Sequence, residues 1–376
     1  MSPSLRFPEF TGEWEKCKLG TLATKVGSGS TPKGGDAVYT SIGHYFVRSQ
    51  NVGMGFLMLD NIAHINDDIH QKHKATEIYE NDVLLNITGA SIGRTAVATK
   101  ELEGGNVNQH VCIIRTNSKV NPKFLCDYIQ TQRIQNHIKS LQTGGSREGL
   151  NFEQIRSFPI SLPSINEQNK LTCLLDKINE RIATQVRLID RLQSLMKGIR
   201  HRIINEAKGK IVCLCEVSDI YQPQTISSAD LTETGYPVYG ANGIIGHYTS
   251  YNHEAEQVCI TCRGNTCGGV NYTKSKSWIT GNAMVVNVDR YQNIVSKRYL
   301  YHYLSNCDFN SIISGSGQPQ IVRAPLAKFK IILPTVMQQY KIAHCLDVIQ
   351  NKINVNSNIL NLLIRQKQYL LRKMFI

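Results

Sequence analysis

The chain has 376 residues and a formal charge of +13 at pH 7, from 42 Lys and Arg against 29 Asp and Glu. This length allows two domains that each bury a core without disulfides. The 11 scattered cysteines and the lack of an N-terminal signal segment exclude a secreted disulfide scaffold. The lack of a long apolar run excludes a membrane-spanning protein. We therefore expect a cytoplasmic protein with an acidic partner, for which nucleic acid is favoured over a lipid surface.

The first segment, residues 1–162, predicts a mixed, mainly β domain. Short β-branched or aromatic runs such as "VCIIRT" alternate with stretches rich in Gly, Ser and Asn. Toward its end the glycine loop "TGGSREGLN", residues 143–151, leads toward the strand that precedes a helix. An earlier loop, "GSTPKGGD" from Gly29, approaches the Walker pattern but lacks the lysine and the hydroxyl after its second glycine. We interpret it as a turn-rich segment near a phosphate or a base edge.

Residues 163–209 predict a long helix. Its start is marked by Ser164 and, three residues later, Glu167, the spacing of a capping box in which both side chains bond free N–H groups of the helix end. Apolar residues then recur at alternating intervals of three and four, as Leu175, Ile178, Ile182, Ile189, Leu192, Met196, Ile199 and Ile203. Gln185 breaks this stripe. Heptads sustained in this way predict a coiled coil, and the alternative is an ordinary core helix.

Residues 210–333 predict a second mainly β domain that resembles the first. "ITCRGNTCG" at 260–268 resembles "ITGASIG" at 87–93, and "YLYHYL" at 299–304 resembles "FLCDYI" at 124–129. We expect the two domains to share a fold while their surface chemistry has diverged.

Residues 334–376 repeat the first helix after an interval of 171 residues. The repeat places Phe158, Leu162, Pro163, Gln168, Lys170 and Asp176 on Phe329, Leu333, Pro334, Gln339, Lys341 and Asp347. Thr335 and Gln338 supply a second capping box. The apolar stripe runs through Ile342, Leu346, Ile349, Ile353, Leu360, Leu363, Leu370 and Met374. Asn356 and Lys367 break it, and Asn356 is the equivalent of Gln185.

The repeat predicts an α+β fold with two mixed, mainly β domains, each followed by a long helix, and with the two helices packed as an antiparallel coiled coil about an internal pseudo-twofold axis. In such a pair the helix midpoints lie level. We therefore hypothesise that Gln185 and Asn356 form a central buried polar contact that fixes the register at some cost in stability. The alternative is two solvated amides at a loose point of the seam.

An internal twofold axis suits B-DNA, whose strands are related by local dyads. Because the two domains differ in sequence, we expect each to read a different short sequence, with an unread gap whose length the helices set. The domain at 1–162 has 17 basic and 15 acidic residues, and the domain at 210–333 has 10 basic and 8 acidic residues. The helical segment 163–209 has 9 basic and 5 acidic residues, and the segment 334–376 has 6 basic and 1 acidic residue. So small an excess in each domain predicts modest DNA affinity for the chain alone, although a solvated helix face also explains the helical charges.

Motifs for catalysis and metal binding are missing or weak in the sequence. Pro-Pro, which a methyltransferase acting on base amines needs, does not occur, and no cluster of paired carboxylates with a lysine suggests a nuclease. Cys259 and Cys262 form one C-x-x-C pair in a predicted strand, where cysteine is a small buried hydrophobe. His110 and His247 fit surface or core positions. We expect no catalysis and no metal site in this chain.

The chain resembles the specificity subunits of type I restriction-modification enzymes over essentially its whole length. The segments "GEWEKCKLGTLA", "GLNFEQIRSFPISLPSINEQNKL" and "YPVYGANGIIGHY" are similar to recurrent segments of that family. The second helix start departs from the pattern, with Met337, Gln338 and Gln339 where the family usually has a Glu-Gln pair such as Glu167-Gln168. A glutamine still allows capping there, so the predicted helix stands.

The resemblance implies a non-catalytic subunit with two target-recognition domains that bind a split sequence in double-stranded DNA. It implies that two separate modification subunits bind S-adenosylmethionine and methylate adenine, and that restriction subunits use ATP and Mg²⁺ to translocate and cut. No cofactor is expected on this chain, and no membrane is expected as a partner. The alternatives are a coiled-coil protein-binding scaffold without DNA readout and an enzyme with a cryptic nuclease site.

Base readout needs donors and acceptors that project into a groove, typically Arg to guanine and Asn or Gln to adenine, with Lys and Ser on phosphates. Loop residues of these types are the candidates for DNA binding, and the alternative for each is a surface or turn-stabilising role. They are Arg48, Asn51, Arg94, Gln109 and Arg147 in the first domain and Asn242, His247, Arg263, Asn265, Lys274, Gln318 and Gln320 in the second.

Overall fold

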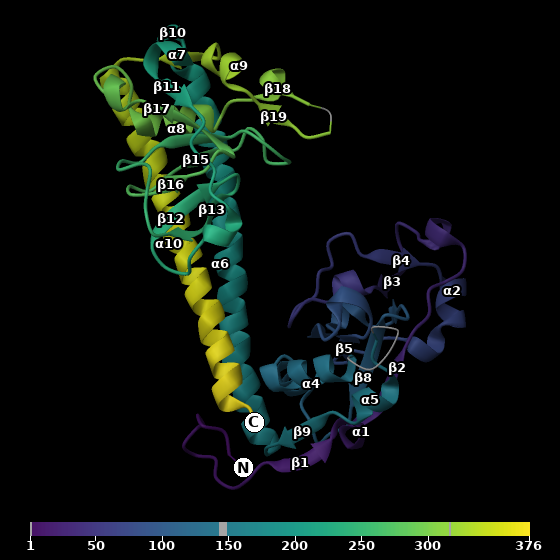
Figure 1. The fold of residues 1–376 in the computed structure, drawn as a ribbon. Coiled ribbons are helices and arrows are strands. Elements are labelled where there is room, and N and C mark those ends of the chain that lie inside the picture. Colours follow the sequence, from purple (N-terminus) through teal and green to yellow (C-terminus); the bar gives the residue numbers. More distant parts are fainter. Residues whose placement is uncertain (1, 143–148, 316) are drawn as a thin grey trace. The chain divides into compact units, whose positions relative to one another are not determined.

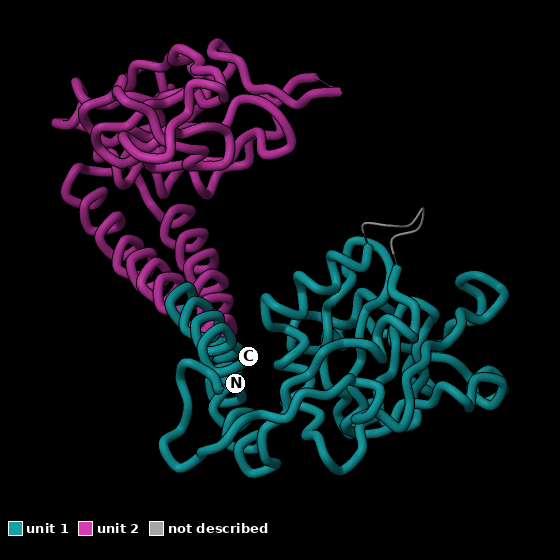
Figure 2. The backbone as a smooth tube through the Cα atoms, turned by 60° about the horizontal axis from the view of Figure 1, so that its bottom comes forward, with its two compact units in different colours: residues 1–184, 360–376 teal, residues 185–359 magenta. Residues whose placement is uncertain are grey.

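The computed structural model describes residues 2–142, 149–315 and 317–376. The chain forms two compact units, which we call unit 1 (Met1–Thr184 with Leu360–Ile376) and unit 2 (Gln185–Ile359) (Figure 2). Each unit contains one β-rich domain and a part of both long helices, which Figure 1 labels α6 and α10. These helices span Ile165–Glu206 and Val336–Met374.

The domain of unit 1 has a four-stranded antiparallel sheet and a three-stranded sheet. The four strands, in the order β2-β8-β5-β6, are Ala23–Ser28, Val111–Thr116, Val83–Asn86 and Thr95–Val97. The three strands, in the order β4-β3-β7 with β3 and β7 parallel, are Ala63–Ile65, His44–Val47 and Asn106–Val107. Strands β1 (Glu15–Lys18) and β9 (Pro159–Leu162) form a further pair. The helices are α1 (Leu19–Leu22), α2 (Asp67–Lys72), α3 (Pro122–Ile129), α4 (Gln132–Gln142) and α5 (Phe152–Arg156), with 3-10 turns at Gly35–Val38, Ser49–Asn51, Lys74–Thr76, Gly89–Ser91 and Lys100–Leu102.

The domain of unit 2 repeats this plan. Its four strands, in the order β11-β17-β14-β15, are Asp219–Tyr221, Ala283–Asn287, Val258–Thr261 and Val270–Tyr272. Its three strands, in the order β13-β12-β16, are Gly243–Tyr248, Tyr236–Gly240 and Trp278–Ile279. Two further pairs are β10 (Lys210–Cys213) with β20 (Lys330–Leu333) and β18 (Ile313–Ser314) with β19 (Gln320–Ile321). The helices are α7 (Leu214–Val217), α8 (Lys297–Leu304) and α9 (Arg323–Ala327), with 3-10 turns at Ser228–Asp230, Asp289–Tyr291 and Asn310–Ile312.

Strand register makes the two domains comparable residue by residue. Val83 pairs with Val97 in unit 1, and Val258 pairs with Tyr272 in unit 2, so both partners shift by 175 residues. Helix α8 begins and ends 175 residues after α3. The prediction of two domains with one fold is therefore confirmed.

The long helices pack antiparallel within each unit. In unit 1, Leu171 and Leu175 near the start of α6 share a core with Met374 near the end of α10. In unit 2, Met196 in the later part of α6 shares a cluster with Leu346 in the earlier part of α10. The predicted seam residues thus bury the apolar face of each helix, as an antiparallel coiled coil requires. The predicted fold class is confirmed.

A buried glutamine joins each helix start to its own domain. The amide of Gln168 donates from Nε2 to Pro163 O at 2.9 Å and accepts at Oε1 from Asn121 N at 2.8 Å. Gln339 makes the same two bonds, at the same distances, to Pro334 O and from Ser296 N. Asn121 and Ser296 cap α3 and α8. Each domain is therefore held on its helix by the same contacts.

The two helix starts differ in their capping. Thr335 and Gln338 form the predicted reciprocal box, since Thr335 N donates to Gln338 Oε1 at 3.2 Å and Gln338 N donates to Thr335 Oγ1 at 3.4 Å. In the first copy the N–H of Glu167 still donates to Ser164 Oγ at 3.4 Å. Its carboxylate, however, accepts from Arg6 at 2.7 and 2.8 Å. The reciprocal half of that prediction is wrong, because charge-assisted bonds to a guanidinium are stronger than a bond to a backbone N–H.

Gln185 and Asn356 meet in unit 2. Gln185 Nε2 donates to Asn356 Oδ1 at 2.6 Å and to Asn356 O at 3.0 Å. Both residues are half-buried, so the expectation of a buried contact is corrected. Two helices alone cover a seam from two sides, which leaves its polar positions partly open to water. That this pair fixes the helix register stays a prediction.

The long helices are amphipathic rather than apolar all round. Among residues 2–142, 149–315 and 317–376, no helix has the length and apolarity to cross a bilayer.

Candidate nucleic-acid interface

In unit 1, a glycine allows the loop after β2 to lie against the end of β7. Gly29 N donates to Asn108 O at 3.2 Å, and a Cβ at Gly29 would stand 1.7 Å from Val107 O. A residue with a side chain cannot occupy this position without moving the backbone. The close approach brings Thr31 to Gln109, so two segments far apart in sequence share one polar edge of the domain.

Four side chains at this edge form a connected chain of hydrogen bonds. Thr31 donates to Gln109 Oε1, Gln109 Nε2 donates to His110 Nε2 at 3.1 Å, and His110 Nδ1 bonds Thr88 Oγ1. Because Nε2 of His110 accepts, its proton lies on Nδ1. The amide of exposed Gln109 is thereby fixed in orientation, while one N–H and one lone pair stay free for a ligand. This arrangement suits recognition of a planar group such as a base.

In unit 2, the corresponding edge is built from Arg263 and the start of β19. Arg263 and Gln320 form an antiparallel bridge, with Ile321 N donating to Cys262 O and Gly264 N donating to Pro319 O, each at 3.0 Å. The side chains of Arg263 and Gln320 are exposed. A guanidinium and an amide therefore stand together on a backbone held by two strands.

Backbone hydrogen bonds show that the two edges are equivalent. Ile87 N donates to His110 O and Ile87 O accepts from Leu150 N. Cys262 makes the same pair of bonds with Asn282 O and Ile321 N. The residues after these two positions, Thr88 and Arg263, therefore correspond, as do His110 and Asn282, and Gln109 and Gly281. One backbone framework presents different side chains in the two domains.

Comparison with known proteins identifies this architecture. Residues 11–194 and 207–365 match the family described as the type I restriction modification DNA specificity domain. The chain belongs to this family. It is 26% identical over 291 residues, 71% of each chain, to the type I restriction enzyme EcoprrI specificity subunit of Escherichia coli. Its fold is similar to that of the type I restriction-modification S subunit from M. genitalium, with a TM-score of 0.68, 16% identity and coverage of 100% of this chain and 99% of that one.

A second solved chain, from a structure of the type I R-M system in a study of complex assembly and conformational transition, has a TM-score of 0.57 and 18% identity and covers 98% of both chains. The protein is therefore a DNA specificity subunit of a type I restriction-modification system. Such a subunit is not itself catalytic and acts with separate methyltransferase and restriction subunits, as the sequence resemblance implied.

The candidates of the first domain occupy different environments in this specificity subunit. Gln109 and Arg94 are exposed, and Arg48 is half-buried with its guanidinium carbon 5.4 Å from the centre of the Tyr39 ring. Asn51 is buried, accepts from Arg48 N at 3.0 Å and donates to Met58 O at 2.9 Å. Asn51 therefore stabilises a turn and is withdrawn as a DNA contact. Arg147 lies outside the described residues.

In the second domain, most candidates lie on exposed loops as expected. Exposed positions are held by Asn242, Arg263, Asn265, Lys274, Gln318 and Gln320. His247 was expected in a loop but lies in β13, half-buried and paired with Pro237. Gln320 likewise lies in the short strand β19. For His247 a local signal was overlooked, because β13 forms a hairpin with β12 whose turn contains the dipeptide Asn242-Gly243. Strand β19 has only two residues, which is too short for a recognisable alternation.

Sequence reasoning missed three contributors to the edge of unit 1. Thr31 and Thr88 were not singled out, and His110 was assigned to the surface or core. Their roles depend on hydrogen bonds between segments 22 to 78 residues apart. A sequence signal does exist at Gly29, because a glycine directly after a strand indicates a close backbone approach.

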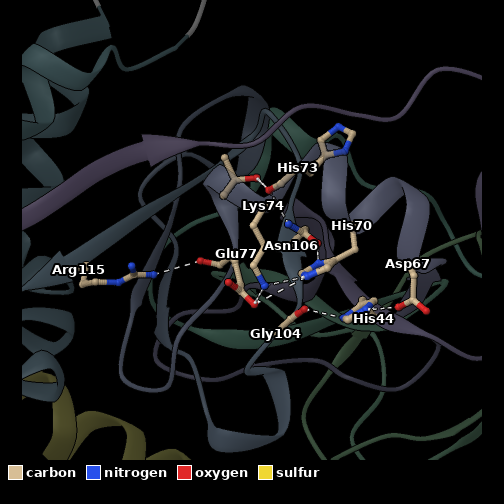
Figure 3. Close-up of polar contacts among 10 residues, drawn as sticks. His44, Asp67, His70, His73, Lys74, Glu77, Gly104, Asn106 and Arg115 are labelled. Carbon is tan, nitrogen blue, oxygen red and sulfur yellow. Dashed lines mark hydrogen bonds and ion pairs between the residues drawn. The ribbon is translucent and has the colours of Figure 1, made fainter.

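A second polar cluster in unit 1 has a structural role (Figure 3). His44 and His70 stack with ring centres 3.8 Å apart, His44 Nε2 bonds Asp67 at 2.7 Å, and His70 Nδ1 bonds Asn106 Oδ1 at 2.7 Å. Lys74 donates to Glu77 at 2.8 Å on the other side of His70. These bonds fasten α2 to the three-stranded sheet and leave the ring nitrogens engaged.

All eleven cysteines are free, and Cys259 is buried in β14, where burial raises the pKa of its thiol. Within the described part of the chain, no group of three or more His, Cys, Asp and Glu side chains is placed to hold a metal ion.

Proposed function

We propose that this specificity subunit reads a bipartite site in double-stranded DNA, each domain contacting one part through the edge described above. The observation that carries the proposal is the equivalence of backbone positions with different side chains. Thr88 and Gln109 in one domain stand where Arg263 and Gly281 stand in the other. One framework with two sets of side chains offers two hydrogen-bonding patterns, which an asymmetric DNA site requires.

The side chains suggest a division of work at each edge. The oriented amide of Gln109 matches N6 and N7 of adenine, and the guanidinium of Arg263 matches O6 and N7 of guanine, each pair being worth about 1–3 kcal/mol of discrimination. Exposed Arg94 and Lys274 suit phosphates. The remaining candidates for contact are Arg48, Arg147, Asn242, His247, Asn265, Gln318 and Gln320.

The helices set the distance between the two readings. In this proposal the target-recognition domains span 1–162 and 210–333, the spacer helices span 163–209 and 334–376, and the Gln185–Asn356 hydrogen bond holds the register. A polar pair in an apolar seam favours one alignment because any shifted alignment leaves both amides facing apolar neighbours.

The protein partners in this proposal are two modification subunits and the restriction subunits, which carry S-adenosylmethionine, ATP and Mg²⁺, in the cytoplasm. Exposed apolar residues on the helices of unit 2 support protein docking there. Val348 and Val355 on α10 are 54% and 56% exposed and lie seven residues apart, and Leu188 and Leu195 on α6 repeat that spacing. Apolar rows on a helix surface are typical of helix–helix interfaces.

A salt titration of DNA binding by the chain assembled with its modification subunits tests the proposal. Affinity for duplex DNA carrying the methylated sequence should fall steeply as salt rises, with a lower affinity for a scrambled duplex. A coiled-coil scaffold that binds proteins only would show no sequence preference and no steep salt dependence. That result would reject the proposed readout.

A further inference from the structure

A cavity of about 350 Å³ opens in unit 1 between α3, β6, the segment around Phe56 and the first half of α6. Its lining has an apolar part and an acidic part. Three carboxylates, of Glu101, Asp127 and Asp176, face a single lysine, Lys123, whose Nζ bonds Asp176 at 2.7 Å. On a chain with a formal charge of +13, this cavity is locally acidic.

Asp127 is the unusual member of this lining because it is only 5% exposed. Its Oδ1 accepts from Gln130 Nε2 at 3.2 Å, and Gln130 Oε1 in turn accepts from Lys367 Nζ at 3.0 Å. Within the described residues its other oxygen has no hydrogen-bond donor. Burial raises the pKa of Asp127 to about 7. A buried carboxyl group without a directly bonded cation either holds a proton or takes a cation from a ligand.

The second domain shows the same place in a filled state. Helix register puts Arg298 at the position of Lys123, Tyr301 at that of Cys126 and His302 at that of Asp127. Strand register puts Tyr272 at the position of Val97. There Arg298 binds Asp347 through two nitrogens, and its guanidinium carbon lies 4.4 Å from the centre of the Tyr272 ring and 5.4 Å from that of Tyr301. His302 also bonds Asp347, at 2.7 Å.

Unit 1 differs from this filled state in two ways. Val97 and Cys126 replace two tyrosine rings, which leaves open space, and a carboxylate replaces a histidine, which adds a negative charge. The segment that carries the lining residue Phe56 adds a third feature, because Met54, Phe56 and Met58 are exposed by 39%, 57% and 37%. Exposed methionine and aromatic side chains beside a charged cavity are typical of protein interfaces rather than of nucleic-acid contacts.

We propose that this cavity binds the guanidinium group of an arginine side chain from a partner protein. The guanidinium takes the place that the second domain fills with its own side chains, bonding Asp127 while the Phe56 ring covers its face. The carboxylates repel DNA phosphates, so this surface serves protein assembly. The inference goes beyond DNA readout and does not depend on it.

Methionine-methyl NMR of the full chain tests this proposal, since Met54 and Met58 adjoin in sequence the lining residues Gly55 and Leu57. The probe is N-acetyl-arginine amide, and its matched control is N-acetyl-citrulline amide, which has the same shape without the charge. We expect the arginine probe to shift the Met54 and Met58 signals saturably, and the citrulline probe to bind at least about tenfold more weakly. The signals of Met196 and Met284 in unit 2 should not move.

Three variants sharpen the test. Asp127→Asn should weaken the arginine probe at least about tenfold, Val97→Tyr with Cys126→Tyr should abolish its binding, and Glu80→Gln, an exposed carboxylate outside the cavity, should change nothing. Unshifted spectra of the remaining methionines would show that the variants fold. Equal binding of both probes, undiminished binding to Asp127→Asn, or no saturable shift at millimolar concentrations would overturn the proposal. Tighter binding of spermidine than of the arginine probe would assign the cavity to a free polyamine instead and overturn the protein assignment.

Discussion

Replacement of Asp127 by asparagine should stabilise unit 1 at neutral and higher pH. Asparagine keeps the oxygen that accepts from Gln130 and removes the charge that burial disfavours. The folded carboxyl has a pKa of about 7 against an ordinary value of 3.8, so between these values the folded state holds a proton that the unfolded state has released. The stabilising contribution of this group is therefore complete below about pH 4 and is lost as pH rises to about 7.

The size of the effect follows from the shift. At about 1.4 kcal/mol per pKa unit, a rise from 3.8 to about 7 corresponds to at most about 4 kcal/mol of destabilisation of the wild-type chain above pH 7. Asp127→Asn should recover part of this at about pH 8 and nothing at about pH 4. The free energy of unfolding in urea is the measurement. Because Trp14 lies in the core of unit 1 and Trp278 in unit 2, a Trp278→Phe background isolates the signal of unit 1.

Glu80→Gln is the control, since this side chain is exposed in the folded chain. Its free energy of unfolding should follow the wild type at both pH values. The reasoning is refuted if Asp127→Asn changes stability by the same amount at about pH 4 and pH 8, or destabilises unit 1 at both.

Three further substitutions test the fold. Gly29→Ala should cost more than about 2 kcal/mol of unfolding free energy and weaken readout by the first domain, because its Cβ would meet Val107 O at 1.7 Å. Gly27→Ala is the control and should be tolerated, since a Cβ there has nothing within 4 Å. Equal effects of the two substitutions would contradict this account. Gln185→Leu alone should cost about 1 kcal/mol of unfolding free energy by leaving Oδ1 of Asn356 without its donor, and adding Asn356→Leu should restore or raise stability. A double-mutant cycle in urea would measure this coupling, and strictly additive effects would argue against a coupled pair. Arg298→Ala should cost about 2–3 kcal/mol in unit 2, followed by Trp278 fluorescence, and a loss below about 0.5 kcal/mol would show that its part-buried ion pair is unimportant.

Local patterns predicted the long helices and their antiparallel pairing. The heptads, the repeated proline and cap, and the level positions of Gln185 and Asn356 are all visible in sequence, because a helix face is set by spacing within one segment. The shared fold of the two domains also left a sequence trace. The start of α6 was predicted, but the partner of the Glu167 side chain was not, since this carboxylate bonds Arg6, 161 residues away, instead of capping its own helix.

The interface itself was predictable only in part. Residue type and loop position selected Gln109 and Arg263 as candidates, and the structure places these two residues on equivalent edges of the two domains. The same reasoning also selected Asn51, because an asparagine that holds a turn and one that reads a base look alike in sequence. The acidic cavity was not predictable, although the alignment of "FLCDYI" with "YLYHYL" already places Asp127 on His302. Its lining comes from the segment around Phe56, from β6, from α3 and from α6, and only the folded chain brings these segments together.

Adenine-methylation mapping tests the central claim most directly. The enzyme assembled from this chain and its modification subunits should methylate one bipartite sequence, and Gln109→Ala and Arg263→Ala should each relax a different part of it while leaving the other part and the gap unchanged. If both variants relaxed the same part, or if neither changed the methylated sequence, the assignment of one reading edge to each domain would be contradicted.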